Sequence, residues 1–201
     1  MLAASACFVG RSVSVLSPTA IHYVTKNRLL PPYPAGLETV AFGMGCFWCA
    51  EALFASSPGI YVTLTGYSQG VTSNPSYEEV CSGRTNHSEV VQVVYDPAVR
   101  SFRSLLKEFW ELHDPTTHMR QGNDAGTQYR SGIYYTSESQ RVEADETKQL
   151  YENALGRTIV TEIEPLKNFY PAEEYHQQYD LKPGSRQYCG LRPTGVTLPE
   201  A

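Results

Sequence analysis

Long apolar runs are missing from this sequence: no stretch approaches the roughly 18 to 20 consecutive apolar residues that a membrane-spanning helix needs. Clusters of lysine and arginine are also missing, and the net charge is −5. An acidic balance without a basic patch argues against a nucleic-acid-binding surface. We therefore expect neither a membrane nor a nucleic acid as a partner.

Regularly spaced cysteines are also missing: the five cysteines of the chain lie at irregular intervals, as Cys7, Cys46, Cys49, Cys81 and Cys189. An odd number without regular spacing is not a disulfide framework, and such thiols are typical of proteins in a reducing compartment. A metal centre is not indicated either, because there is one C-x-x-C, no second one and no H-x-x-x-H. We expect no metal and no organic cofactor.

Acidic residues are absent from the first 37 positions, which carry Arg11, Lys26, Arg28 and several serines. This composition fits a plain N-terminal arm, and it also fits a weak mitochondrial transit peptide. No basic region precedes an apolar one, so a secretory signal is not indicated. We divide the chain into an arm, residues 1–37, and one domain, residues 38–201. We expect a cytoplasmic protein, with a mitochondrial one as the alternative.

The domain alternates between strand and helix patterns. Strands are predicted at 38–44, 61–67, 88–96, 133–137 and 158–166, and helices at 46–55, 101–113 and 138–155. This order, β-α-β-β-α-β followed by α-β, predicts an α+β two-layer sandwich of ferredoxin-like type. Two long loops, after the second strand and at 114–132, and an irregular tail from 167 indicate functional segments.

Cys46 of "GMGCFWCAE" (43–51) falls where a predicted strand gives way to a helix. Unpaired backbone N–H groups and the helix dipole stabilise a thiolate at that position and lower its pKa. Cys46 is therefore a candidate nucleophile, with a buried apolar cysteine as the structural alternative. Cys49 lies one helical turn further on, close enough for a disulfide, so the pair also fits a thioredoxin-like redox motif.

Seven segments together resemble a known family: "GMGCFWCAE", "NPSYEEVCSGRTNHSEVV", "YDP", "FWELHDPT", "RQGNDAGTQYRS", "EEYHQQY" and "YCG". Over about residues 39–201 the chain is similar to the A-type peptide methionine sulfoxide reductases. The resemblance implies thiol-dependent reduction of methionine-S-sulfoxide, free or in proteins, as a repair of oxidative damage. It also implies thioredoxin as the reductant, and we expect a monomer.

The resemblance also implies the roles of the site residues. Cys46 attacks the sulfoxide sulfur, and Cys189 resolves the resulting sulfenic acid to a disulfide. Glu89 protonates the sulfoxide oxygen, which is a poor leaving group otherwise. Tyr77 and Tyr129 donate hydrogen bonds to that oxygen, and Asp124 supports the polar side of the site. Phe47 and Trp48 form an apolar pocket for the methyl group of the substrate.

Taken singly, these residues have ordinary structural explanations. A glutamate that enters a β-branched strand, as Glu89 does, usually faces solvent. Tyr77 and Tyr129 would more often belong to the core or its rim, and Asp124 to a turn. Four of the five histidines are expected to be structural: His87, His113, His118 and His176, of which His176 is expected to hold the tail in place.

The chain departs from the family at Cys49, where members usually carry glycine. Some members have a second resolving cysteine near the C-terminus, where this chain has Thr197, so Cys189 is the only thiol of the tail. Whether Cys49 also acts as a resolving thiol is left open. Two other classes compete. A thioredoxin-like disulfide oxidoreductase using Cys46 and Cys49 leaves Glu89 without a role. A non-catalytic, tyrosine-lined binding module leaves the position of Cys46 unexplained.

Overall fold

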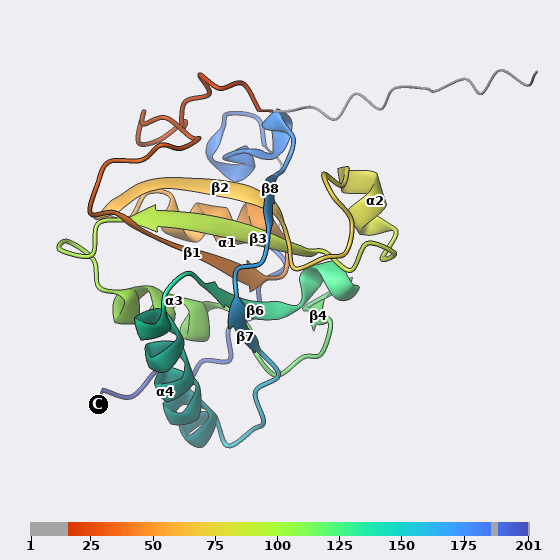
Figure 1. The fold of residues 1–201 in the computed structure, drawn as a ribbon. Helices are drawn as coiled ribbons and strands as arrows, with labels where there is room; N and C mark the ends of the chain where they lie inside the picture. Colours follow the sequence, from red (N-terminus) through yellow and green to blue (C-terminus); the bar gives the residue numbers. More distant parts are fainter. Residues whose placement is uncertain (1–15, 186–188, 201) are drawn as a thin grey trace, which may run out of the picture.

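A six-stranded mixed sheet forms the centre of the computed structural model, which describes residues 16–185 and 189–200 (Figure 1). Its strands are β1 (Glu38–Met44), β2 (Ile60–Ser68), β3 (Ser88–Tyr95), β6 (Ser131–Tyr135), β7 (Glu162–Pro165) and β8 (Phe169–Pro171). They lie in the order β7-β6-β1-β3-β2-β8, and every neighbouring pair is antiparallel except β6 and β7. A small second sheet pairs β4 (Arg120–Gln121) with β5 (Asp124–Ala125).

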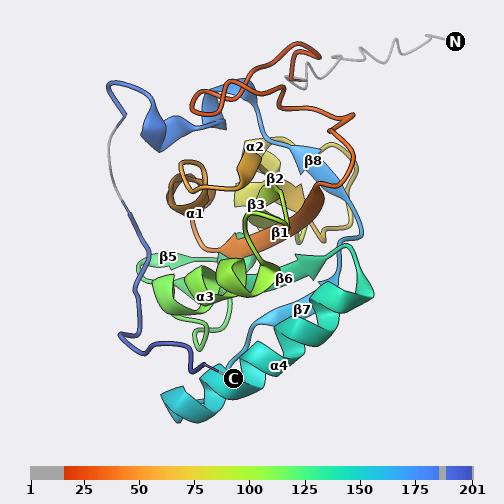
Figure 2. The ribbon, with the colours of Figure 1, turned by 90° about the vertical axis from the view of Figure 1, so that its left-hand side faces the viewer.

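Three helices pack on one face of the sheet: α1 (Phe47–Phe54), α3 (Phe102–Leu112) and α4 (Glu138–Leu155). Figure 2 shows α1 and α3 on the same side, with α4 alongside β6 and β7. The core between them is aromatic, with the Phe42 ring 5.4 Å from Phe54 and 5.2 Å from Phe109. No helix in the described ranges is both long and apolar enough to cross a membrane.

All eight predicted strands and helices are present, so the α+β class is confirmed. The bounds of α4 match because Ser137 caps its N-terminus and Gly156 ends it with φ +63°. Short elements within the loops and tail were not predicted, since two to five residues carry no clear periodicity: α2 (Tyr77–Cys81), β4, β5, β8, η1 (Thr127–Tyr129), η2 (Glu174–His176) and η3 (Tyr179–Leu181). The ferredoxin-like detail stays a prediction, because β7 and β8 extend the four central strands.

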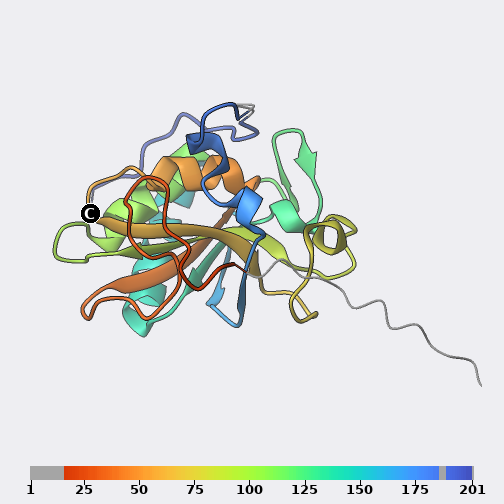
Figure 3. The same ribbon diagram turned by 90° about the horizontal axis from the view of Figure 1, so that it is seen from above.

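The arm and the tail frame this sheet from outside. Leu16 and Leu29 of the arm are buried against Val62 and Leu64 of β2. The η3 turn of the tail contacts α1, and residues 189–200 lie beside α3 and α4 (Figure 2), where the backbone N–H of Leu198 donates to Glu111. Seen from above, the arm and the segment after β8 lie on the same side of the molecule (Figure 3). Arm and tail meet near α1, because the backbone N–H of Tyr23 donates to the side chain of Gln178, whose own backbone N–H donates to Glu51 of α1.

Candidate functional site

Antiparallel pairing brings the predicted site residues to one end of the sheet. The end of β1, the end of β2 and the beginnings of β3 and β6 meet there, with Tyr67 opposite Glu89 and Met44 opposite Ser131. The two long loops leave from this end, and Figure 1 shows α2 and β4 both on that side of the sheet. Residues from four distant parts of the chain thus face one another.

Cys46 is the N-cap residue of α1. Gly45 before it has φ +90°, and a Cβ there would lie 2.6 Å from the Cβ of Gln121, so the turn into α1 requires glycine. The thiol of Cys49 lowers the pKa of Cys46, and the backbone N–H groups of Cys49 and Trp48 act in the same direction. Burial and the carboxyl of Asp124 oppose them. Cys46 therefore lies at the N-terminus of a helix, the position that the sequence predicts and that stabilises a thiolate.

Glu89 is the second chemical group of the site and is only 1% exposed. Its Oε2 accepts a hydrogen bond from the backbone N–H of Phe47 at 3.2 Å, and its Oε1 has no partner within residues 16–185 and 189–200. Burial raises its pKa well above the ordinary value, and the neighbouring charge of Cys46 adds to this. The structural alternative, in which Glu89 faces solvent, does not hold, because the start of α1 covers the carboxyl.

Tyr77, Tyr129 and Asp124 lie around this carboxyl. Burial raises the pKa of both tyrosines, and the charge of Glu89 raises it further, so both are neutral hydroxyls at pH 7. Burial also raises the pKa of Asp124, although Arg192 opposes it. The structure thus brings together the predicted acid and the two predicted neutral donors, with a carboxyl next to them.

Phe47 and Trp48 form an aromatic group with residues of the tail. The indole N–H of Trp48 donates to Nδ1 of His176 at 3.0 Å, and the indole stacks on Tyr179 with ring centroids 4.1 Å apart. The ring of Tyr77 lies 4.6 Å from that of His176. His176 therefore links the predicted apolar pocket to Tyr77, one of the two tyrosines predicted to bind the oxygen.

Glu173 and Tyr67 also belong to the site, and sequence reasoning missed both. The two carboxylate oxygens of Glu173 accept hydrogen bonds from the backbone N–H of Tyr77 at 3.0 Å and the hydroxyl of Tyr67 at 2.8 Å. The partners are 96 and 106 residues away in the chain. In the sequence only the segment "EEYHQQY" indicates this region, and it does not show which of its two glutamates contacts the site.

Three thiols come together beside α1. Cys49, which is buried, interacts with the side chains of both Cys46 and the exposed Cys189. Cys81 is exposed and lies against Tyr77, and Cys7 falls outside the described residues. Cys46, Cys81 and Cys189 are free thiols. No group of three or more residues able to hold a metal occurs in the described part of the chain.

The remaining predicted structural histidines bind the backbone or face solvent. One ring nitrogen of His87 contacts the carbonyl of Thr72 at 2.8 Å, and one of His113 contacts the carbonyl of Phe109. Both histidines are buried, and burial lowers their pKa. His118 is exposed.

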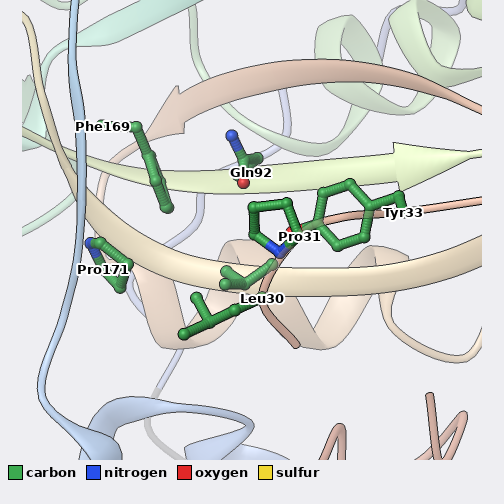
Figure 4. Close-up of a pocket in the computed structure, with 7 residues that line it drawn as sticks. Leu30, Pro31, Tyr33, Gln92, Phe169 and Pro171 are labelled. Carbon is green, nitrogen blue, oxygen red and sulfur yellow. The ribbon is translucent and has the colours of Figure 1, made fainter. Parts of the chain in front are cut away.

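An apolar cavity of about 450 Å³ opens elsewhere, on the sheet face opposite to Glu89. Its side chains are shown in Figure 4, and they come from the arm, β2, β3 and the β8 region: Leu30, Pro31, Tyr33, Leu64, Gln92, Phe169 and Pro171. Successive side chains of a strand point to opposite faces, so Gln92 cannot reach the side on which Glu89 lies. The cavity shares no residue with the thiol site.

A thiol that takes an oxygen atom from a substrate needs an acid that protonates the oxygen. It also needs a second thiol that converts the oxidised first thiol back to its reduced form. Cys46, Glu89 and the neighbouring thiols of Cys49 and Cys189 supply these groups at one end of α1. The site is therefore that of a thiol-dependent oxidoreductase.

Residues 38–197 match the family described as peptide methionine sulfoxide reductase, and the chain belongs to that family. It is 53% identical to peptide methionine sulfoxide reductase MsrA 1 of Caulobacter vibrioides, over 99% of this chain and 93% of that protein. The crystal structure of reduced Mxr1 from Saccharomyces cerevisiae superposes with a TM-score of 0.75 at 37% identity, covering 83% of this chain and 97% of Mxr1. Mxr1 in complex with Trx2 gives 0.55 at 27% identity, over 88% and 99% of the two chains.

Proposed function

We propose that the protein reduces methionine-S-sulfoxide, free or in proteins, with Cys46 as nucleophile and Glu89 as acid. The observation that carries the proposal is the Glu89 carboxyl, buried against the N-terminus of α1 with its pKa raised and one oxygen unengaged. A carboxyl with a raised pKa retains its proton near neutral pH, and only then can it donate that proton to the sulfoxide oxygen.

The first step transfers two electrons and one oxygen atom. The Cys46 thiolate attacks the sulfoxide sulfur while Glu89 gives its proton to the oxygen, with Tyr77 and Tyr129 as hydrogen-bond donors to that oxygen. Methionine leaves, and Cys46 remains as sulfenic acid. Phe47 and Trp48 hold the methyl group, and Asp124 supports the polar side of the site.

The second step restores the thiol. Cys189 attacks the sulfenic acid of Cys46, water leaves and a disulfide forms, which an external dithiol then reduces. The proximity of Cys46, Cys49 and Cys189 supports this step and leaves Cys49 open as a second resolver. Thioredoxin is the dithiol that we propose, because the related Mxr1 forms a complex with Trx2. We further propose that the protein acts as a monomer.

Turnover of methionine sulfoxide with dithiothreitol tests the proposal. We expect methionine to form from the S epimer of free and peptide-bound methionine sulfoxide, and no turnover by Cys46→Ser. Absent turnover together with robust reduction of insulin disulfides would replace the proposal by a thioredoxin-like disulfide oxidoreductase using Cys46 and Cys49. Absence of both activities would favour a binding module.

A further inference from the structure

Glu51 is a buried carboxyl that the proposed reaction does not use. It lies on α1 and has no exposed surface. Its Oε1 accepts hydrogen bonds from the hydroxyl of Thr63 at 3.0 Å and the side-chain amide of Gln178 at 2.8 Å. Its Oε2 accepts one from the backbone N–H of Gln178 at 2.6 Å. Three donors therefore converge on one side chain from β2 and from the tail.

The direction of the hydrogen bond from Thr63 to Glu51 is fixed from the arm. The Nδ1 atom of His22 accepts from the backbone N–H groups of Val24 at 3.2 Å and Thr25 at 3.0 Å, so its hydrogen sits on Nε2. That Nε2 faces the hydroxyl of Thr63 at 2.9 Å and donates to it, and Thr63 in turn donates to Glu51. An acceptor-only carboxylate fits the end of this relay better than an amide would.

Gln178 connects Glu51 to the residues that contact Trp48. It has φ +49°, a left-handed conformation that needs support in a residue other than glycine. The next residue is Tyr179, which stacks on Trp48, and two residues earlier is His176, which accepts the hydrogen bond from Trp48. The side-chain oxygen of Gln178 also accepts from the backbone N–H of Tyr23 in the arm, at 3.2 Å.

We propose that Glu51 is a positioning residue for the substrate pocket: through the relay His22–Thr63–Glu51–Gln178, the arm and α1 hold the tail segment that supports Trp48. The inference rests on the proposed function, in which Trp48 lines the pocket for the methyl group. Glu51 acts on substrate binding and not on the reacting atoms, since its contacts lead to Trp48 and not to the Cys46 sulfur or the free oxygen of Glu89.

Thr63→Val tests the relay in the full chain, because it removes the hydroxyl and keeps the shape of the side chain. Thr65→Val is a matched control: it lies on the same strand and face, is equally buried, and its hydroxyl has no partner among the residues that the structure describes. Glu51→Gln is the second variant. The readouts are KM and kcat for N-acetyl-methionine sulfoxide with dithiothreitol, and acrylamide quenching of tryptophan fluorescence. Quenching reports on Trp48, because Trp110 is fully buried.

Thr63→Val and Glu51→Gln should raise KM about fivefold, the equivalent of one hydrogen bond worth about 1 kcal/mol, with kcat within about twofold of the unmodified protein. Both should increase the quenching of Trp48, and Thr65→Val should change neither quantity. Unchanged KM and quenching in folded Thr63→Val would overturn the proposal, as would an equal effect in Thr65→Val. If the unmodified protein has no turnover, the proposed function fails, and quenching alone decides whether the relay positions Trp48.

Discussion

The indole N–H of Trp48 donates a hydrogen bond to Nδ1 of His176 across 3.0 Å, although 128 positions separate the two residues in the chain. The acceptor nitrogen must be unprotonated, and burial lowers the pKa of His176 to about 4. The bond is therefore present throughout the neutral pH range. The bond connects Trp48, which lines the proposed pocket close to Cys46, to the irregular tail.

Replacing His176 by phenylalanine should weaken substrate binding. The variant keeps an aromatic ring between Phe47 and Tyr77 but removes the acceptor for Trp48. We expect KM to rise about fivefold to tenfold with a small change in kcat, because the loss is one hydrogen bond in the pocket wall. Steady-state kinetics give both values, with the exposed His118→Ala as control. A fall in kcat at unchanged KM would instead assign His176 to the chemical step.

Glu89→Gln should abolish most of the chemistry while preserving the fold. Glutamine can still accept from the Phe47 N–H but has no proton to give, so single-turnover formation of methionine should slow by about 100-fold or more. In the unmodified protein the rate should fall as the pH rises through the raised pKa of Glu89, because the acid is then lost. The variant should lack this limb. Identical pH profiles for both proteins would exclude Glu89 as the acid.

Cys49→Ala should make Cys46 less reactive. The Cys49 thiol is the largest influence that lowers the pKa of Cys46, so its removal raises that pKa and reduces the thiolate fraction at pH 7. Alkylation of Cys46 by iodoacetamide, followed by mass spectrometry, should be several-fold slower. Cys49→Ser retains a hydroxyl donor and should stay closer to the unmodified protein. Equal rates in Cys49→Ala, Cys49→Ser and the unmodified protein would contradict the role of this donor.

Cys189→Ser should permit one stoichiometric turnover and lose cycling driven by thioredoxin. The reduction of the sulfoxide needs Cys46 alone, whereas regeneration needs the second thiol. Mass mapping of the unmodified protein after one equivalent of sulfoxide should find Cys46 joined to Cys189. A product that is mainly Cys46–Cys49 would make Cys49 the resolver, an outcome that the contact of Cys49 with both sulfurs allows.

Glu51 should make the folded state less stable as the pH rises. Burial raises its pKa to about 7, against the hydrogen bonds from Gln178 and Thr63 and the charge of Lys182. Because the folded state then binds the proton more tightly than the unfolded state does, stability falls between about pH 4.5 and pH 7. The full effect is about 3 kcal/mol, at about 1.4 kcal/mol per pKa unit. Urea unfolding of Glu51→Gln should show a correspondingly flatter pH dependence; an unchanged one would mean that Glu51 has an ordinary pKa.

Local chemistry in the sequence determined the regular elements and the position of the nucleophile. Gly45 marks the end of β1 after residue 44, and capping by Ser137 and Gly156 sets the bounds of α4 at 138–155. The glycine before Cys46 and the apolar run after it predict that Cys46 lies at the start of a helix. These signals act over a few residues, so a single sequence is enough to read them.

The environment of Glu89, the contacts of His176 and the relay through Glu51 were decided only by the tertiary structure. A strand pattern cannot tell that both faces of β3 are covered, so the sequence leaves the burial of Glu89 undetermined. Hydrogen bonds such as those from Gln178 to Glu51 span 127 positions and leave no periodic trace in the sequence. The sequence by itself determined which chemical groups the protein carries. Desolvation and long-range packing, which exist only in the folded chain, decided how those groups are tuned and which residues hold them in place.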